Sequence, residues 1–274
     1  MNDRHYPPWE RFGEELRKLR TVAGMTQTRL AQQINLSQSM VGFIERGERP
    51  PQRQHVEALE EVFATDGSLL RKWSHIKERE NLPDWYRQVV ASEERAREIR
   101  MWHPTLVPGL LQTPEYASVV FQAGRPLDTD DEIAKDVAAR VARFDQLTKR
   151  GGPRLWAAVD ETVIRRSVGD RKVTRSQLLR LIELARAGTV RIQVVPTETP
   201  HHPGLAGPFR LVTFDDREAM VYVEHAAGGE LISDGVEVRR LSALFGELQA
   251  WALTPRESIG LIEEVASAIP VAQE

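Results

Sequence analysis

MTQTRLAQQINLSQSMVGFIERGERPP, residues 25–51, is the stretch of sequence that decides the fold of the N-terminal part of the chain. Two groups of apolar residues recur in it at helical spacing, which predicts two short helices in succession. The apolar positions are Leu30, Ala31 and Ile34 in the first group and Met40, Val41 and Ile44 in the second. Thr26 and Ser37 stand where side-chain caps open helices, and Gly47 stands where the second helix ends.

The turn between these two helices needs one residue that tolerates a positive φ angle. Asn35 occupies the turn, and asparagine visits that region more readily than other residues with a side chain. Two short helices joined in this way predict a helix-turn-helix, whose second helix inserts its N-terminal end into the major groove of DNA. The residues expected on the exposed side of that helix are Gln38, Ser39, Gly42 and Phe43. A helical bundle without a role in DNA binding is the alternative, and the polar side chains at this helix end argue against it.

The residues on either side of this motif complete a mainly α domain of five helices, expected over residues 1–80. The helix before the motif can end at Gly24, Pro50 and Pro51 mark the start of the fourth helix, and Ser68 is expected to cap the fifth. The expected inward residues are Phe12, Leu16, Leu19 and Ala23 in the first helix, Val56, Leu59 and Phe63 in the fourth, and Leu69, Leu70, Trp73 and Ile76 in the fifth.

Charge is unevenly distributed along the chain, whose net charge is −3. Between Arg11 and Arg53 there are eight basic and four acidic residues, an excess of +4, and the residues after Arg53 sum to about −6. A basic head on an acidic body favours a nucleic-acid contact at one end of the chain. The overall charge argues against a protein that coats nucleic acid along its whole length.

Residues 25–27, 30–31, 36–39, 41 and 44–51 together resemble the helix-turn-helix of the lambda-repressor/Cro-like family, also called the XRE family. The turn, the caps and the exit segment all match that family at the right spacing. In the family, the start of the second helix contacts the phosphate backbone, and the first exposed residues of the third helix read bases. The resemblance therefore implies that the chain binds double-stranded DNA.

The resemblance also implies a role for each outward residue. Gln27 would hold a phosphate, and Arg46 and Arg49 would flank the DNA backbone. Gln38 and Phe43 would face base edges together with Ser39, although Phe43 departs from the polar residue often found there and could only contact a thymine methyl group. The candidate DNA-binding residues are Thr26, Gln27, Ser37, Gln38, Ser39, Gly42, Phe43, Arg46 and Arg49.

Residues 81–274 are expected to form an α+β domain in which a small sheet is wrapped by helices. Strands are expected at 155–159, 190–195, 209–214 and 220–223, and an extended segment at 102–108. Helices are expected from Asp84 with Trp85, Val89 and Ile99, from Thr113-Pro114, from Thr129, after the cap Asp160, from Thr174 to Gly188, from Val236 to Leu253, and from Thr254. Capping boxes, in which a threonine is followed three residues later by Glu or Gln, are expected at Thr129 with Glu132, Thr174 with Gln177, and Thr254 with Glu257.

This second region also resembles a known domain. Asp84-Trp85-Tyr86, residues 108–117, Asp160-Glu161 and residues 202–205 resemble the C-terminal domain that accompanies an XRE head in many actinobacterial regulators. The block at 108–117, PGLLQTPEYA, is the most specific of these. Members are transcriptional regulators, or antitoxin-like regulators whose genes neighbour a small partner protein. The resemblance implies regulation and supplies no catalytic site.

Composition and motifs disfavour catalysis. The chain has no cysteine, which excludes disulfides, thiolate zinc sites and a cysteine nucleophile, and it has no His-Glu-x-x-His helix, phosphate loop or Gly-x-Ser-x-Gly elbow. The candidate metal or acid–base residues are His201, His202, Glu224 and His225. Adjacent histidines on an extended segment point in opposite directions, and a phospholipase-D-like half-domain would need a lysine and an aspartate that do not follow His202. We therefore expect structural histidines, no enzyme activity, no cofactor and no metal site.

Two functions of different class remain. The first is a sequence-specific DNA-binding transcriptional regulator, with a recognition helix at about 37–46 and a C-terminal domain for dimerisation and for sensing a partner or ligand. The second is an antitoxin-like interaction protein that binds a small protein encoded nearby and binds DNA as autoregulation. One helix-turn-helix reads too few base pairs for useful selectivity, so a homodimer is expected.

Two further expectations concern location and one loop. The N-terminus lacks the apolar stretch of a signal peptide, and no run of about 18 apolar residues exists, so we expect a cytoplasmic protein with no contact to a membrane. The connection at 197–208 is long and rich in proline and glycine, and connections of this kind are usually functional or disordered. We hypothesise that it borders, with the segment 102–111, a surface that receives a small protein or ligand.

Overall fold

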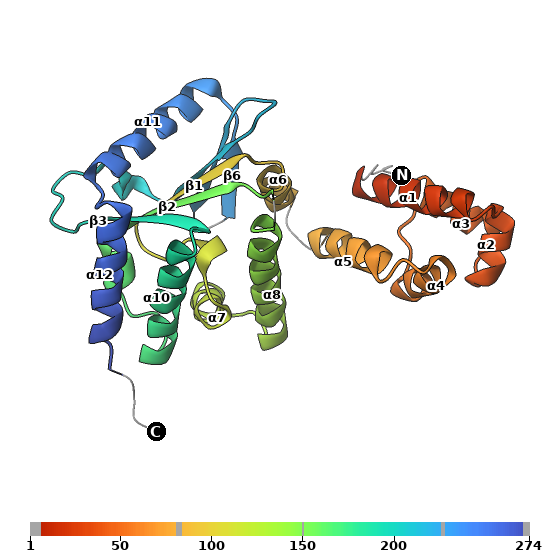
Figure 1. Ribbon diagram of the computed structural model, residues 1–274, viewed down its shortest axis with the longest axis horizontal. Coiled ribbons are helices and arrows are strands. Elements are labelled where there is room, and N and C mark those ends of the chain that lie inside the picture. The colour runs from red at the N-terminus through yellow and green to blue at the C-terminus, as the bar shows by residue number, and fades with distance from the viewer. Residues whose placement is uncertain (1–6, 81–83, 150, 226–227, 271–274) are drawn as a thin grey trace. The chain divides into compact units, whose positions relative to one another are not determined.

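Five helices form the N-terminal unit, residues 1–83, of the computed structural model (Figure 1). The structure describes residues 7–80, 84–149, 151–225 and 228–270. The helices of this unit are α1 (Pro7–Val22), α2 (Gln27–Gln33), α3 (Gln38–Glu45), α4 (Arg53–Phe63) and α5 (Ser68–Glu80). Each contributes buried apolar residues to one core, which includes Phe12, Leu30, Ile44, Leu59 and Leu69. The mainly α, five-helix head is therefore confirmed.

The expected caps and turn residues of the helix-turn-helix are present in the structure. The hydroxyl of Thr26 accepts a hydrogen bond from the backbone N–H of Arg29 at 3.1 Å, and that of Ser37 accepts from Met40 at 3.2 Å. Asn35 has a φ of 54°, so it supplies the left-handed residue of the turn. Gly47 has a φ of 72° directly after α3.

Two expectations in this unit were wrong. Helix α1 ends at Val22, so Ala23 lies beyond it and is exposed rather than inward. Ser68 is the first residue of α5 and not its cap. The backbone N–H groups at that helix start are instead satisfied by Glu60 of α4, whose carboxylate accepts from Gly67 at 2.8 Å and from Leu70 at 2.7 Å. A side chain from a neighbouring helix has replaced the local cap.

A six-stranded mixed sheet is the centre of the C-terminal unit, residues 84–274. The strands are β1 (Glu98–His103), β2 (Arg154–Asp160), β3 (Val190–Val195), β4 (Phe209–Thr213), β5 (Met220–His225) and β6 (Gly228–Ile232). They lie in the order β3-β2-β1-β4-β5-β6, with β1, β2 and β3 parallel and each pair from β1–β4 to β5–β6 antiparallel. Strand β1 is therefore where the sheet changes from parallel to antiparallel pairing.

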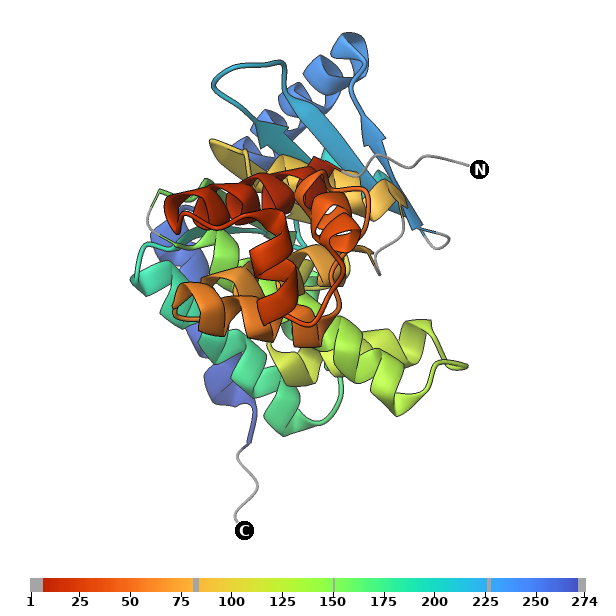
Figure 2. The same ribbon diagram turned by 90° about the vertical axis from the view of Figure 1, so that its right-hand side faces the viewer.

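Helices cover both faces of this sheet. The described helices of the unit are α6 (Asp84–Glu93), α7 (Pro114–Gly124), α8 (Asp130–Leu147), α9 (Glu161–Arg165), α10 (Arg171–Arg186), α11 (Gly235–Trp251) and α12 (Pro255–Ala268). One face packs Ile99, Ala157 and Ile192 against α7, α8, α10 and α12, and the other packs Trp102 and Phe209 against α11. Figures 1 and 2 both show α11 on the side of the sheet opposite α10 and α12. The expected α+β domain is confirmed.

Three details of the C-terminal unit differ from the expectations. Ile99 lies in strand β1 and not in a helix, because α6 ends at Glu93 and the following residues alternate between the two faces of the sheet. Strand β6 was not anticipated. Thr174 and Gln177 lie inside α10, which Asp170 caps, so they form no capping box. Both side chains are buried and hydrogen-bond to backbone groups elsewhere in the chain, Thr174 to Val168 and Gln177 to Leu111 and Thr113.

The caps at Thr113, Thr129, Asp160 and Thr254 are confirmed, and the last helix begins with a complete capping box. Within the described ranges, no helix is both long and apolar enough to cross a bilayer.

The connection between β3 and β4 is fastened to the sheet and is not an open loop. It contains a short 3₁₀ helix, η2 (Pro203–Ala206). Trp102 Nε1 donates to the carbonyl oxygen of Gly204 at 2.8 Å, and the ring of His202 packs edge-on against Trp102. Thr197 at its start donates from its backbone N–H to Glu161 at 2.9 Å.

This packing predicts that Gly204 tolerates no side chain. A Cβ atom there would lie 2.4 Å from the Trp102 ring, so we expect Gly204→Ala to destabilise the protein by about 2 kcal/mol or more. Gly246→Ala on α11, where a Cβ meets no atom within 4 Å, is the matched control and should be neutral or slightly stabilising. Urea unfolding of the full chain, followed by tryptophan fluorescence, measures both. Equal midpoints for the two variants would contradict the described contact.

Candidate nucleic-acid interface

The N-terminal end of α3 presents polar side chains to solvent. Ser37, Gln38 and Ser39 are exposed there, and the hydroxyl oxygens of Ser37 and Ser39 lie 3.0 Å apart. The cap at Ser37 uses its oxygen as an acceptor toward Met40, which sets the direction in which the helix begins. Thr26, at the start of α2, is exposed as well. An exposed, polar helix start of this kind can enter a DNA groove.

A chain of hydrogen bonds links α2 and α3. The side-chain amide of Gln38 donates to Gln27 Oε1 at 2.7 Å, and the amide of Gln27 donates to Glu45 Oε2 at 2.8 Å. Glu45 in turn accepts from Arg20 of α1, at 2.5 Å from Nε and 3.0 Å from Nη2. Gln27, the expected phosphate contact, therefore also orients Gln38, the expected base reader.

Glu45 is the residue of this interface that sequence reasoning missed. It is 2% exposed, at the C-terminal end of α3. Burial opposes its ionisation, but the hydrogen bonds from Arg20 and Gln27 outweigh that cost and hold the pKa of Glu45 below its ordinary value. The sequence carried only part of the signal: Glu45 falls one helical turn after the buried Val41, whereas its partners Arg20 and Gln27 lie on α1 and α2.

Two arginines stack on one aromatic ring at the other end of α3. The guanidinium carbons of Arg46 and Arg49 lie 5.1 and 5.6 Å from the centroid of the Phe43 ring, within cation–π range. Arg46 also pairs with Glu48, with Nε 2.6 Å from the carboxylate. Phe43 is therefore half-buried beneath cations, and it positions the two residues expected to flank the DNA backbone.

Gly42 does not lie on the exposed side of α3, as the sequence had suggested; it is buried. A Cβ atom at this position would meet the Arg46 guanidinium at 3.2 Å and the Gln27 amide at 3.8 Å. Two long polar side chains fold over the helix surface here, which helical periodicity alone could not show. The side chains of Gln27 and Arg46 thus lie over the surface of α3 at Gly42.

Close contact between α1 and α3 holds α3 in place. At Gly13 a Cβ atom would lie 2.4 Å from the carbonyl oxygen of Ile44, so only glycine lets the two backbones approach this closely. Together with the Arg20–Glu45 pair, this contact fixes α3 against the first helix.

His202 of the C-terminal unit has structural partners. His202 is buried, its Nε2 lies 3.2 Å from Asp160 Oδ2, and its Nδ1 accepts from the backbone N–H of Gly204 at 3.3 Å. His201 is exposed. Among the described residues there is no group of three or more side chains that could hold a metal ion.

These features define a helix-turn-helix protein with an α+β C-terminal domain. Residues 11–73 match the family described as a helix-turn-helix domain. Residues 86–264, about two thirds of the chain, match the domain of unknown function DUF5753, and the chain belongs to that family. Neither the curated proteins nor the solved structures gave a match.

The interface predicts different roles for Gln38 and Arg49. A bidentate glutamine–adenine contact is worth about 1–3 kcal/mol of discrimination, so Gln38→Ala should relax sequence preference at the base pair it reads while keeping non-specific affinity. Arg49→Ala should weaken binding to all sequences alike and reduce the salt slope by about one. Binding isotherms on specific and scrambled duplexes at several salt concentrations measure both, with Gln122→Ala, exposed on α7, as the control. Unchanged preference in Gln38→Ala would remove it from the interface.

The buried Glu45 predicts a pH dependence for the stability of the N-terminal unit. Glu45→Gln leaves Arg20 without its charge partner and should cost about 3 kcal/mol at pH 7. Because the folded-state pKa of Glu45 is below 4.5, its contribution is present above pH 4.5 and is lost as the pH falls through that lower value. The difference between wild type and variant should therefore shrink in acid.

Urea unfolding at pH 7, 5 and 3.5, followed by circular dichroism, measures this difference. Glu57→Gln, which breaks only the exposed pair with Arg53, should change stability by about 0.3–0.5 kcal/mol. A wild type and a Glu45→Gln variant that lose stability in parallel from pH 7 to 3.5 would refute the role given to Glu45.

Proposed function

We propose that this protein is a sequence-specific DNA-binding transcriptional regulator of the XRE type, with the segment at about 37–46 as the recognition helix in the major groove. The observation that carries the proposal is the hydrogen-bonded pair Gln27–Gln38 at the exposed start of α3. A glutamine whose amide is oriented by a second glutamine offers a preorganised donor and acceptor to an adenine edge.

Electrostatics support the same assignment. Arg46 and Arg49 sit together on Phe43 and bring two positive charges to the C-terminal end of the helix that begins with Gln38. Phosphate contacts of this kind fix the register of a protein on the duplex but carry no sequence information. In this proposal one end of α3 reads bases and the other end binds phosphate. A recognition helix needs both kinds of contact.

In this proposal the C-terminal unit dimerises and senses a partner or ligand, and it binds without catalysing a reaction. Two heads related by a two-fold axis would read half-sites about 34 Å apart, one turn of DNA. As a DNA-binding regulator the protein would act in the cytoplasm.

Two experiments test the proposal. Gel shifts with the DNA upstream of the protein's own gene, with and without the product of the neighbouring gene, should show specific retardation by this protein alone. Retardation only in the presence of the neighbouring product would favour the antitoxin-like alternative, and none in either condition would refute the regulator. Light scattering of residues 84–274 should give a dimer at micromolar concentration, and a clean monomer would remove dimerisation from the C-terminal unit.

A further inference from the structure

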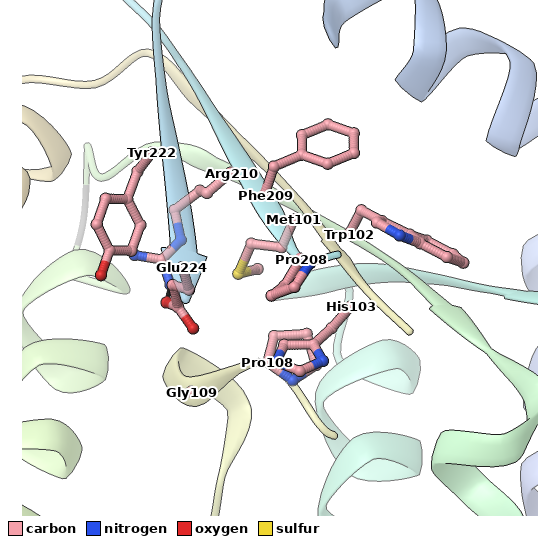
Figure 3. A pocket seen from close by; sticks show the side chains of 10 residues that line it. All are labelled: Met101, Trp102, His103, Pro108, Gly109, Pro208, Phe209, Arg210, Tyr222 and Glu224. Atoms are coloured by element: carbon pink, nitrogen blue, oxygen red, sulfur yellow. Dashed lines mark ion pairs between the residues drawn. The ribbon is translucent and has the colours of Figure 1, made fainter. Parts of the chain in front are cut away.

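A small pocket opens at the carboxyl end of β1, where the sheet changes from parallel to antiparallel pairing (Figure 3). Its lining includes His103 at the end of β1, Pro108 and Gly109 just after it, and Pro208 before β4. Ligands of open α/β sheets bind outside the carboxyl ends of strands where the strand order reverses, and in this sheet it reverses between β1 and β4. The pocket also lies where the two segments that the sequence singled out, 102–111 and 197–208, meet.

Arg210 on β4 lines this pocket with unused hydrogen-bonding capacity. Its side chain is 6% exposed, and Nη1 donates to the carboxylate of Glu93. Nε has no hydrogen-bond partner among the described residues, and Nη2 lies 3.8 Å from Glu224 Oε1, beyond hydrogen-bond distance. An arginine presents Nε and Nη2 as a fork that matches a carboxylate with two parallel hydrogen bonds. In Arg210 neither nitrogen of this fork has a hydrogen-bond acceptor among the described residues, and Nε is buried.

His103 adds a neutral donor to the same pocket. Its Nδ1 accepts from the backbone N–H groups of Leu106 at 3.0 Å and Thr105 at 3.3 Å, so the proton of the neutral ring lies on Nε2. Burial lowers the pKa of His103 to about 4, which keeps the ring uncharged at pH 7.

Charged side chains of both signs surround the pocket. Arg140, Arg143 and Arg210 interact with the carboxylates Glu93 and Glu224. Burial raises the pKa of Glu93 to about 6. Of these side chains, Arg210 and Glu224 line the pocket.

We propose that this pocket binds the carboxylate group of a small organic ligand, with Arg210 as the bidentate anchor and His103 as a second donor. The proposal rests on the regulatory function proposed above and names the ligand of its sensing domain. Glu224, whose side chain is 41% exposed, stands beside the Arg210 fork in the free protein (Figure 3). The ligand carboxylate takes the place beside Arg210 and displaces Glu224 toward solvent.

The same arginine also holds the end of α6. Glu93, its partner on the other side, is the last residue of α6, and Arg143 of α8 lies 3.2 Å from the second carboxylate oxygen of Glu93. A ligand that draws Arg210 toward itself weakens its bond to Glu93 and so loosens the end of α6.

The test uses the full chain with sodium acetate and sodium butyrate as probes, against sodium chloride at equal ionic strength and inorganic phosphate. Quenching of tryptophan fluorescence, to which Trp102 beside the pocket contributes, and the rise in melting temperature report binding. Both carboxylates should saturate, whereas chloride and phosphate should not. Glu224→Gln, which removes the competing charge, should tighten acetate binding about tenfold, and His103→Phe should weaken it about tenfold.

Glu230→Gln, an exposed carboxylate on β6, is the matched control and should bind acetate as the wild type does. No saturable response to either carboxylate, or an identical response in wild type and Glu224→Gln, overturns the site. Equal binding of phosphate overturns the ligand class. DNA affinity measured in the same samples separates the two proposals: a protein that binds acetate but never binds DNA refutes the regulator and leaves the pocket in place.

Discussion

The carboxylate of Glu45, buried between three helices, makes the interactions on which the candidate DNA-binding surface depends. It ties Arg20 of α1 to the end of α3 and holds the amide of Gln27, which holds the amide of Gln38. The side chain proposed to read bases, Gln38, is thus oriented by a charge two hydrogen bonds away. Because a buried charge is tolerated only when it is paired and hydrogen-bonded, this network selects one arrangement of the three helices.

Much of the head could be predicted because its signals are local. A cap at Ser37, a left-handed Asn35 and a glycine after α3 each act within four residues, and each was found where the sequence placed it. Glu45 could not be assigned in the same way, because its partners come from two other helices. The prediction that Ser68 caps α5 was wrong for the same reason: the side chain that accepts hydrogen bonds from the start of α5 is Glu60, which belongs to α4.

In the C-terminal unit, local sequence patterns did not predict every element correctly. Strand β2 has an apolar centre and β3 alternates apolar with polar residues before a final pair of valines, and both were recognised. Strand β1 carries the charged residues Glu98 and Arg100 on either side of Ile99 and was placed partly in a helix. Thr174 looked like a cap because its side chain can satisfy backbone groups, and it does so for Val168 from inside α10. Burial of polar side chains in the folded chain, Arg210 and Glu93 among them, cannot be seen in a periodicity.

Strand β1 connects the loop before β4 with the proposed pocket. Trp102 on one face of the strand secures that loop, and His103 at its end lines the pocket.

The central claim is that α3 reads DNA sequence, and selection of binding sites from a random duplex library by the full chain tests it most directly. A dimeric helix-turn-helix should enrich a two-fold symmetric motif with half-site centres about 10 base pairs apart, and Gln38→Ala should lose one conserved position in each half. A library that shows no enriched motif after selection, or the same motif with and without Gln38, would contradict the account.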